Sequence, residues 1–305
     1  MRTVRDLVIV GSGPAGMAAA LRARYDRTDA LLIGNEPPGG LSAAARRIEN
    51  LPWLPRPMSG VEFADLLRRR LDEARIERAE GSVRGARVAE GGFVVDVGPG
   101  GGIACRTLIL ACGTEPAGLS LPGAEPAAEA GLLHRDIRTL PGAVAGARIL
   151  IVGGGEAALD SALWVRDRGG APTICIRRDR IAACPGLIEE LNGSSIAVRS
   201  GLEPVSIEVS QGEIAVAFSS ESGTCRLDCR HVLFCVGRRP RLALYRELGG
   251  GGIPSRRTSG IPGLFLAGDI LRGRDRYIGP ALSDGFRSAA EAARYLVECP
   301  RGEQL

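Results

Sequence analysis

The sequence predicts an α/β protein of two three-layer units, the second inserted into the first. Two glycine-rich turns support this prediction, GSGPAG at Gly11–Gly16 and GGGEAA at Gly153–Ala158. An apolar run precedes each turn, at Leu7–Val10 and Ile149–Val152, and an alanine-rich stretch follows each one. A strand, a tight glycine turn and a helix in this order make up the Rossmann-like unit, in which backbone and helix N-terminus receive a pyrophosphate. Two such units indicate two dinucleotides.

The first unit is predicted to contain parallel strands and two helices before the chain leaves it. Its elements are, in order, a strand, turn and helix to about Arg24, a strand at 30–33, an amphipathic helix at 60–78 and strands at 92–97 and 103–111. Pro and Gly residues at 114–126 then indicate a crossing to the second unit.

The second unit repeats the strand, turn and helix. Its predicted strands are at 148–152, 172–176, 196–198, 206–209, 214–218 and 231–236. A second crossing at 237–240 returns the chain to the first unit, which ends in a short buried strand before Gly268-Asp269 and a helix at about 281–297. The boundaries predicted in this way are 1–117 with 238–305 for the first unit and 118–237 for the second.

Composition excludes several classes of protein. No apolar run approaches the roughly 20 residues that span a bilayer, and the start of the chain lacks a signal-peptide pattern, so a cytoplasmic protein without a membrane role is expected. All 39 basic residues are Arg, which excludes lysine catalysis, and the net charge is +4. Aromatic residues make up only 4%, which argues against nucleic-acid binding.

Cysteine and histidine spacing excludes two further kinds of site. The chain has eight Cys and two His, and no two cysteines form C-x-x-C. Neither a zinc finger nor a redox-active dithiol fits this spacing, and no metal site is expected. We expect all eight cysteines to be small buried hydrophobic residues.

Several motifs in this order resemble the low-molecular-weight thioredoxin reductase family of two-domain pyridine-nucleotide flavoproteins. The resemblance covers nearly the whole chain. The motifs are GSGPAG, Gly39-Gly40 before Ile48-Glu49-Asn50, Leu110-Ala111-Cys112-Gly113, GGGEAALD, Ile176-Arg177-Arg178-Asp179 and Ala267-Gly268-Asp269-Ile270.

This resemblance implies FAD in the first unit and NADPH in the second. Gly11, Gly13 and Gly16 would cradle the FAD pyrophosphate, Asp269 would bond the ribityl chain, and Gly268 would allow close backbone approach. Gly153, Gly155 and Ala158 would hold the pyrophosphate of the nicotinamide dinucleotide. The full set of implied cofactor-binding residues is Gly11, Gly13, Pro14, Ala15, Gly16, Glu36, Gly40, Asn50, Gly113, Gly153, Gly155, Glu156, Ala157, Ala158, Arg177, Arg178, Gly268, Asp269 and Tyr277.

Arg177 and Arg178 follow a predicted strand end and would clasp the 2′-phosphate of NADPH, since a guanidinium is always charged and planar. Ala182 stands at the family's third basic position, so a solvated loop is the alternative for this pair. Gly34 stands where relatives often have a Glu for the adenosine ribose, and Asn35 or Glu36 would substitute for it. Tyr277 either covers the flavin ring or is a packed surface residue.

The catalytic motif is where the sequence departs from the family. Thioredoxin reductases carry C-x-x-C at about 136–139, where this chain reads Asp-Ile-Arg-Thr. The remaining pattern resembles the thioredoxin-reductase-like ferredoxin/flavodoxin–NADP reductases, although Leu41 replaces a polar residue and the C-terminal extension of those enzymes is not seen.

We therefore expect an NADPH-dependent FAD oxidoreductase that has no catalytic side chain of its own and passes electrons to a ferredoxin, a flavodoxin or another acceptor. A flavin-dependent reductase or oxidase of a small molecule and a non-catalytic flavin-binding protein remain alternatives. The two crossings are predicted hinges. The resemblance also implies a homodimer.

Overall fold

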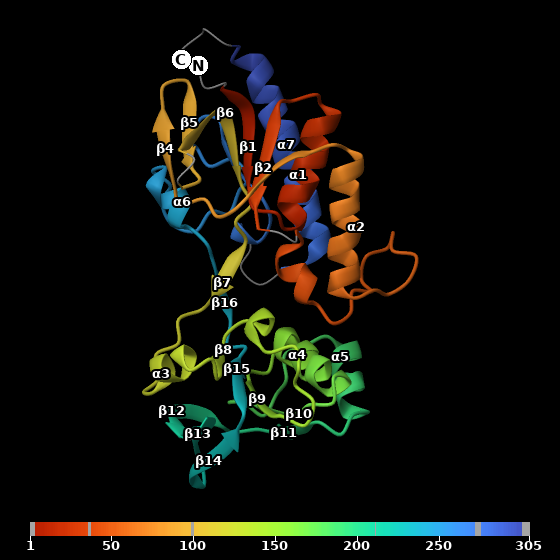
Figure 1. Cartoon of the computed structure of the whole chain (residues 1–305), viewed down its shortest axis with the longest axis vertical. Helices are drawn as coiled ribbons and strands as arrows, with labels where there is room; N and C mark the ends of the chain where they lie inside the picture. The colour runs from red at the N-terminus through yellow and green to blue at the C-terminus, as the bar shows by residue number, and fades with distance from the viewer. Residues whose placement is uncertain (1–3, 36–37, 99–100, 211, 272–275, 301–305) are drawn as a thin grey trace. The chain divides into compact units, whose positions relative to one another are not determined.

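The computed structural model describes residues 4–35, 38–98, 101–210, 212–271 and 276–300. The chain forms two compact units: unit 1 comprises Met1–Glu115 and Arg239–Leu305, and unit 2 comprises Pro116–Arg238 (Figure 1). The predicted α/β class, with two Rossmann-like units of which the second is inserted into the first, is confirmed.

Unit 1 is built on a seven-stranded sheet in the order β3-β2-β1-β6-β5-β4, with β17 also paired to β6. Its strands are β1 (Arg5–Val10), β2 (Ala30–Gly34), β3 (Glu77–Glu80), β4 (Gly85–Ala89), β5 (Gly92–Asp96), β6 (Gly102–Leu110) and β17 (Leu264–Leu266). β1 pairs in parallel with both β2 and β6. The carboxyl end of β1 therefore lies where the strand order changes direction, the point at which open α/β sheets bind ligands.

Three long helices cover one face of this sheet (Figure 1). The helical segments of unit 1 are α1 (Pro14–Tyr25), α2 (Gly60–Glu73), α6 (Ala243–Glu247), α7 (Ile278–Glu298), η1 (Gly40–Ala44) and η3 (Gly268–Ile270). Ser59 begins α2 with a capping box, because its hydroxyl accepts from the Glu62 N–H while the Glu62 carboxylate accepts from the Ser59 N–H.

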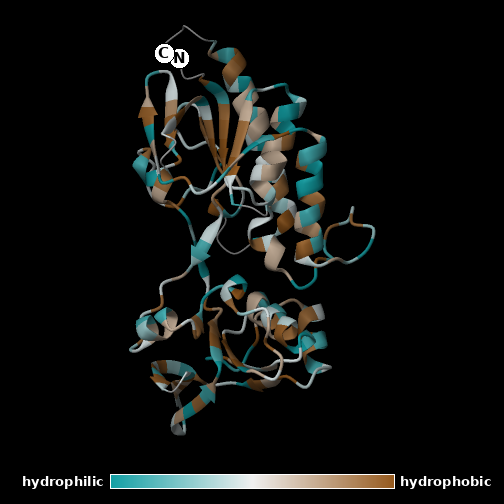
Figure 2. Ribbon diagram, in the orientation of Figure 1, coloured by the Kyte–Doolittle hydropathy of each residue, from teal (hydrophilic) through white to brown (hydrophobic). Residues whose placement is uncertain are grey.

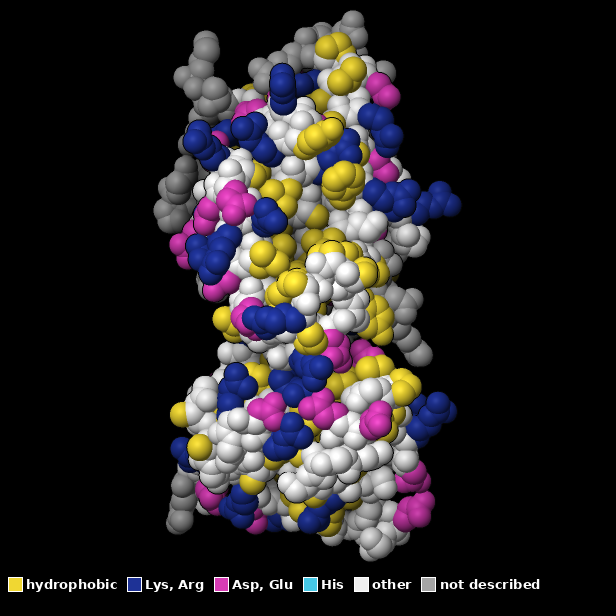
Figure 3. Space-filling model, turned by 90° about the vertical axis from the view of Figure 1, so that its right-hand side faces the viewer, with side chains coloured by type: hydrophobic (Ala, Val, Ile, Leu, Met, Phe, Trp, Pro, Cys, Tyr) yellow, Lys and Arg dark blue, Asp and Glu magenta, His cyan; other side chains and the backbone are white. Residues whose placement is uncertain are grey.

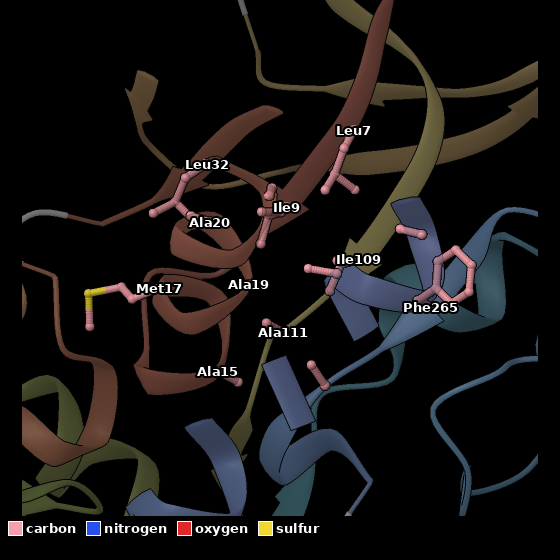
Figure 4. Packing of buried hydrophobic residues seen from close by; sticks show 14 of the residues in the cluster. Leu7, Ile9, Ala15, Met17, Ala19, Ala20, Leu32, Ile109, Ala111 and Phe265 are labelled. Carbon is pink, nitrogen blue, oxygen red and sulfur yellow. The ribbon is translucent and has the colours of Figure 1, made fainter. Parts of the chain in front are cut away.

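Alternation along β1 divides the core of unit 1 into two layers. Leu7 and Ile9 face α1 and α7, whose contact residues are mostly alanine (Figure 4). Val8 and Val10 face the other way, toward α6 and the β4–β5 hairpin. Strands with apolar side chains on both faces are typical of a sheet that is covered on both sides, and Figure 2 shows them as the most hydrophobic part of unit 1.

Unit 2 has a five-stranded parallel sheet in the order β11-β10-β9-β15-β8 and a separate three-stranded antiparallel sheet, β12-β13-β14. The strands are β8 (Leu133–His134), β9 (Arg148–Val152), β10 (Ala171–Cys175), β11 (Ala197–Arg199), β12 (Glu203–Ser210), β13 (Glu213–Ser220), β14 (Gly223–Cys229) and β15 (His231–Phe234). The helical segments are α3 (Ala124–Glu129), η2 (Ile137–Thr139), α4 (Glu156–Asp167) and α5 (Pro185–Asn192). Residues on one face of β9 pack with α4 and α5, and those on its other face pack with the antiparallel sheet.

Both chain crossings form short strands that pair with each other. β7 (Thr114–Pro116) and β16 (Arg238–Pro240) make a two-stranded sheet. The Arg239 guanidinium lies 2.7 Å from the Glu115 carboxylate across this ribbon. The chain therefore leaves unit 1 and returns to it at adjacent positions.

The helix predicted at 60–78 is too long. α2 ends at Glu73, because Arg75 takes a left-handed conformation with φ 53° and turns the chain into β3. Strands β3 and β4 are not expected from the sequence, since they lack a clear alternation of apolar residues. β14 is not expected either, although Cys225, Leu227 and Cys229 alternate with polar residues along it. The expectation that all eight cysteines are buried is confirmed for Cys105, Cys175 and Cys229 only. Cys112, Cys225, Cys235 and Cys299 are partly exposed, and Cys184, which begins α5, is exposed.

Among the described residues, no helix has both the length and the apolar character that a membrane span requires. The same part of the chain holds no cluster of three or more His, Cys, Asp or Glu residues suited to a metal ion.

Candidate functional site

The first glycine turn connects β1 to α1 and is held close to β6. A Cβ placed at Gly11 would lie 2.3 Å from the Ala111 carbonyl oxygen, and one at Gly16 would lie 1.7 Å from the Gly11 carbonyl oxygen. Gly11 also has a φ of 116°, which side chains rarely adopt. Packing inside the protein therefore requires glycine at both positions.

Gly13 differs, because no described residue lies close enough to explain why it lacks a side chain. A Cβ there would meet only the Gly40 Cα, at 3.9 Å. Gly13 is also the N-cap of α1, followed by Pro14, and the unpaired N–H groups of the first helical turn lie at this end of the helix. Open space beside a helix N-terminus fits a pyrophosphate, so these residues fit the diphosphate of FAD.

Segments far apart in sequence meet at this turn. Gly40 begins η1, and a Cβ on it would lie 3.1 Å from the Gly13 Cα. Gly268 begins η3, and a Cβ on it would lie 2.7 Å from the Ala15 Cβ. The structure thus brings Gly40, Gly268 and its neighbour Asp269 to the start of α1.

The remaining predicted residues of unit 1 lie further along their loops. Asn50 is exposed and follows the bridge between Ile48 and Met58, and Gly113 comes three residues after β6 ends. Tyr277 is the N-cap of α7 and is 44% exposed. Glu36 lies outside the described residues.

The second glycine turn repeats the geometry of the first. A Cβ placed at Gly153, which has a φ of 139°, would lie 2.4 Å from the Cys235 carbonyl oxygen beyond β15. Gly155 is the N-cap of α4, and a Cβ on it would meet only the Ala182 carbonyl oxygen, at 4.0 Å. The helix then starts with Glu156, exposed Ala157 and buried Ala158. This turn therefore has the same open N-terminal position as the first and fits a second pyrophosphate.

Arg177 and Arg178 are exposed in the loop after β10, beside the second turn. The same loop returns to the turn at Ala182, whose N–H donates to the Gly154 carbonyl at 2.7 Å. The Arg177 guanidinium lies 3.3 Å from the Glu203 carboxylate, an exposed pair, whereas within the described part of the chain Arg178 makes no ion pair. Arg180 is exposed in this loop as well, a further basic residue near the turn that the sequence did not single out.

Residues 136–139, at about the position where the resemblance implies a dithiol, form a polar turn held by hydrogen bonds. Asp136 caps η2 and accepts 2.8 Å hydrogen bonds from Nε and Nη2 of Arg138. Arg238 of β16 lies 3.4 Å from the same carboxylate. Burial disfavours the charged form of Asp136, but the hydrogen bonds from Arg138 outweigh this effect and lower its pKa.

The only two histidines of the chain are adjacent and buried next to this turn. The Thr139 hydroxyl donates to the Asp136 carbonyl at 2.8 Å, so it accepts from Nδ1 of His134 at 3.1 Å. Nε2 of His134 then accepts from Nδ1 of His231, also at 3.1 Å. Burial, together with the neighbouring His231, lowers the pKa of His134 to about 4, so both rings are held neutral at pH 7.

Ser12 holds the loop after β2 against the first glycine turn, a positioning role that the sequence did not indicate. A Cβ at Gly34 would lie 2.5 Å from the Ser12 Oγ and 2.6 Å from its backbone nitrogen. The Ser12 hydroxyl donates to the Asn35 carbonyl at 2.8 Å, and its own carbonyl accepts from the Gly39 N–H. The position of Ser12 therefore explains why residue 34 is a glycine. Its hydrogen bonds also order the start of the loop that leads to Gly40.

Two repeated strand-turn-helix sites, one in each unit, define an α/β protein with two Rossmann-like dinucleotide-binding domains. The chain belongs to the pyridine nucleotide-disulphide oxidoreductase family, whose model matches residues 5–294. Members of this family use FAD and NADPH, and the open positions at Gly13 and Gly155 fit them.

Proteins that are similar to this chain carry different names. The chain is 30% identical over 311 residues to a thioredoxin reductase of Treponema pallidum, covering 97% of this chain and 98% of the relative. It is 26% identical over 307 residues to a ferredoxin–NADP reductase of Ignicoccus hospitalis, covering 96% and 98%. The crystal structure of Lactococcus lactis thioredoxin reductase superposes with a TM-score of 0.89 at 26% identity, covering 96% and 99%.

Proposed function

We propose that the protein is an NADPH-dependent FAD oxidoreductase that works without a redox-active dithiol and passes electrons to a ferredoxin or flavodoxin. The observation that carries this proposal is the turn at 136–139. It contains no cysteine, and Asp136 and Thr139 are engaged with Arg138, Arg238 and His134. A relay that reduces thioredoxin through a dithiol at this position has no sulfur atoms to use.

The other cysteines do not replace the missing dithiol. Burial raises the pKa of five thiols, Cys105, Cys112, Cys175, Cys229 and Cys235, to about 11 or 12. Because the thiolate is the reactive form, these groups are inert at neutral pH. Cys184 is exposed, but no second cysteine stands at C-x-x-C spacing from it.

The residues of each unit supply binding and orientation. In unit 1, Gly11, Gly13 and Gly16 admit the FAD diphosphate to the start of α1, while Gly268 and Asp269 approach it from η3. In unit 2, the turn at Gly153–Ala158 takes the diphosphate of NADPH, and Arg177 and Arg178 take its 2′-phosphate. A flavin bound in unit 1 would supply the redox chemistry between NADPH and the acceptor.

Two observations support an acidic protein as the acceptor. A relative that covers almost the whole chain is named ferredoxin–NADP reductase. The net charge of +4 also favours encounter with an acidic carrier, since complementary charge steers association. We also propose that the protein acts as a homodimer.

Anaerobic stopped-flow mixing with NADPH, followed at the flavin absorbance, tests the first step. We expect rapid bleaching of the flavin, faster with NADPH than with NADH at equal concentration. A protein that binds FAD and does not bleach with either dinucleotide contradicts the proposal.

A panel of acceptors tests the second step. The reduced protein is mixed with ferredoxin, flavodoxin, thioredoxin and a free flavin or quinone, and flavin reoxidation is measured for each. We expect the protein carriers without a disulfide to reoxidise it and thioredoxin to leave it reduced. Turnover with thioredoxin would overturn the proposal, and turnover with the small molecules alone would identify a small-molecule reductase.

A further inference from the structure

The loop between β10 and α5 carries an arginine that the family resemblance does not account for. Arg177 and Arg178 match the motif, Ala182 stands at the family's third basic position, and Arg180 comes two residues earlier. Arg180 is exposed and makes no ion pair with any residue that the structure describes. Basic and acidic side chains are intermixed on the face of unit 2 that Figure 3 shows, so the local balance between them decides where an anion binds.

The backbone of Arg180 lies beside the second glycine turn. A Cβ on Gly154 would lie 3.0 Å from Cγ2 of Ile176, just after β10, and 3.9 Å from the Arg180 carbonyl oxygen. Two residues later the Ala182 N–H donates to the Gly154 carbonyl at 2.7 Å, which holds this part of the loop near the N-terminus of α4. Both ends of the loop therefore border the turn that fits a pyrophosphate.

The net charge of the loop depends on Arg180. Asp179 directly follows Arg178, and the Glu203 carboxylate lies 3.3 Å from the Arg177 guanidinium. These two acids balance the two arginines of the motif, so the positive charge in excess is that of Arg180. A phosphate dianion is attracted to a surface of net positive charge, and a guanidinium binds it through two N–H groups at once.

Arg180 also stands close enough to serve in place of a side chain at position 182. Two residues of chain span at most about 7 Å, which limits the distance between the Cα atoms of Arg180 and Ala182, and likewise between those of Arg178 and Arg180. The long arginine side chain covers such a distance. The guanidinium groups of Arg178 and Arg180 are therefore able to meet at a single phosphate group.

We propose that Arg180 is the third arginine of the 2′-phosphate site for NADPH, in place of a basic residue at 182, and that it favours NADPH over NADH. The inference rests on the NADPH site of the proposed function and adds a residue that the motif does not contain. The 2′-phosphate is the group concerned, because a Rossmann-like unit places it near the end of the second strand, here β10, whereas the turn itself receives the diphosphate.

Calorimetric titration of the full-length, FAD-loaded protein with adenosine 2′,5′-bisphosphate and with 5′-AMP tests the inference, since these two ligands differ only in the 2′-phosphate. We expect Arg180→Ala to raise the Kd for the bisphosphate at least about tenfold and to leave the Kd for 5′-AMP unchanged. Arg226→Ala, on β14 of the same unit, is the matched control and should change neither value.

A relocated arginine separates the charge from its position. The double variant Arg180→Ala/Ala182→Arg keeps the charge of the loop and moves it to the family's position, where residue 182 is exposed and has room for a long side chain. We expect this variant to bind the bisphosphate more tightly than Arg180→Ala and to approach the wild type. The melting temperature of each variant shows that it is folded.

Three results overturn the inference: an Arg180→Ala variant that binds the bisphosphate as tightly as wild type, an equal loss of affinity for the bisphosphate and 5′-AMP, or a double variant that recovers nothing. The proposed function fails in a different way. A wild type that binds the bisphosphate no more tightly than 5′-AMP contradicts the NADPH site and the inference together. A wild type that prefers the bisphosphate but whose flavin does not bleach with NADPH contradicts the redox function alone.

Discussion

Two glycines of the first turn, three residues apart, lack a side chain for different reasons. Gly16 is required by the protein itself, since a Cβ there would overlap the Gly11 carbonyl, whereas Gly13 faces open space. A substitution at each position therefore separates the stability of the fold from the affinity for FAD.

Gly13→Ala is expected to change the unfolding free energy of the apoprotein by less than about 1 kcal/mol and to weaken FAD binding at least about tenfold. Gly16→Ala is expected to destabilise the apoprotein by roughly 1–3 kcal/mol, because the added methyl group is overpacked. Thermal unfolding of the apoprotein and titration of flavin fluorescence measure the two effects. Undiminished FAD affinity in Gly13→Ala would show that the diphosphate binds elsewhere.

A second prediction at the scale of single residues concerns the two exposed arginines after β10. Arg177→Ala and Arg178→Ala are each expected to raise the KM for NADPH by about 10–100-fold, because a charged hydrogen bond to the 2′-phosphate is lost. The KM for NADH, which has no such phosphate, should stay the same. Arg226→Ala is the matched control, since it removes the same charge from β14 in the same unit. Equal losses with both dinucleotides would place the arginines outside the 2′-phosphate site.

At the scale of secondary-structure elements, the pairing of β8 with β15 brings the two histidines together and makes unit 2 sensitive to acid. An unfolded chain binds protons on histidine near pH 6.5, whereas folded His134 binds one only near pH 4. Stability is therefore lost as the pH falls from about 6.5 to about 4, by up to about 3 kcal/mol for this residue.

His134→Gln removes this titration, so its unfolding free energy should fall less steeply than that of wild type between pH 7 and pH 5. Urea titrations at several pH values measure the two slopes. Parallel slopes would mean that His134 takes up its proton equally in the folded and unfolded states.

Two signals account for the elements that are clearest in the sequence: a run of consecutive buried apolar residues and a glycine turn. β1, β9 and β15 have three or four consecutive buried apolar residues, and α1 and α4 follow glycine turns. β3 reads Glu-Arg-Ala-Glu and is mostly exposed, so its place in the sheet depends on pairing with β2 and not on its own pattern. The end of α2 was missed because Arg75, and not a glycine, takes the left-handed conformation.

The candidate sites likewise have some features that are visible in the sequence and others that depend on the fold. Glycine turns are visible in a sequence because their spacing is fixed. The contacts of Gly40 with Gly13 and of Gly268 with Ala15 join segments that are distant in sequence, and only the resemblance to a family suggested them. Ser12 was missed because its role is to fill the space above Gly34, which depends on how β2 is placed against β1.

At the scale of the whole molecule, unit 2 is one continuous segment of the chain, whereas unit 1 is formed by two separate segments. Unit 2 has its own core on both faces of its sheet, whereas unit 1 depends on β17 and α7 to complete its sheet and to cover α1. We expect residues 116–238 alone to fold with a cooperative thermal transition and to bind NADPH, measured by circular dichroism and calorimetry. Residues 1–115 alone, which lack β17 and α7, serve as the control and should not fold. An unfolded 116–238 fragment would show that unit 2 needs unit 1.

The ribbon formed by β7 and β16 has a consequence for engineering. Because the chain departs and returns through paired strands, the gene segment that encodes residues 116–238 is a cassette whose two junctions lie side by side in the folded protein. A homologous segment with a different nicotinamide preference can be exchanged at these junctions while the coding sequence for the flavin unit is left untouched.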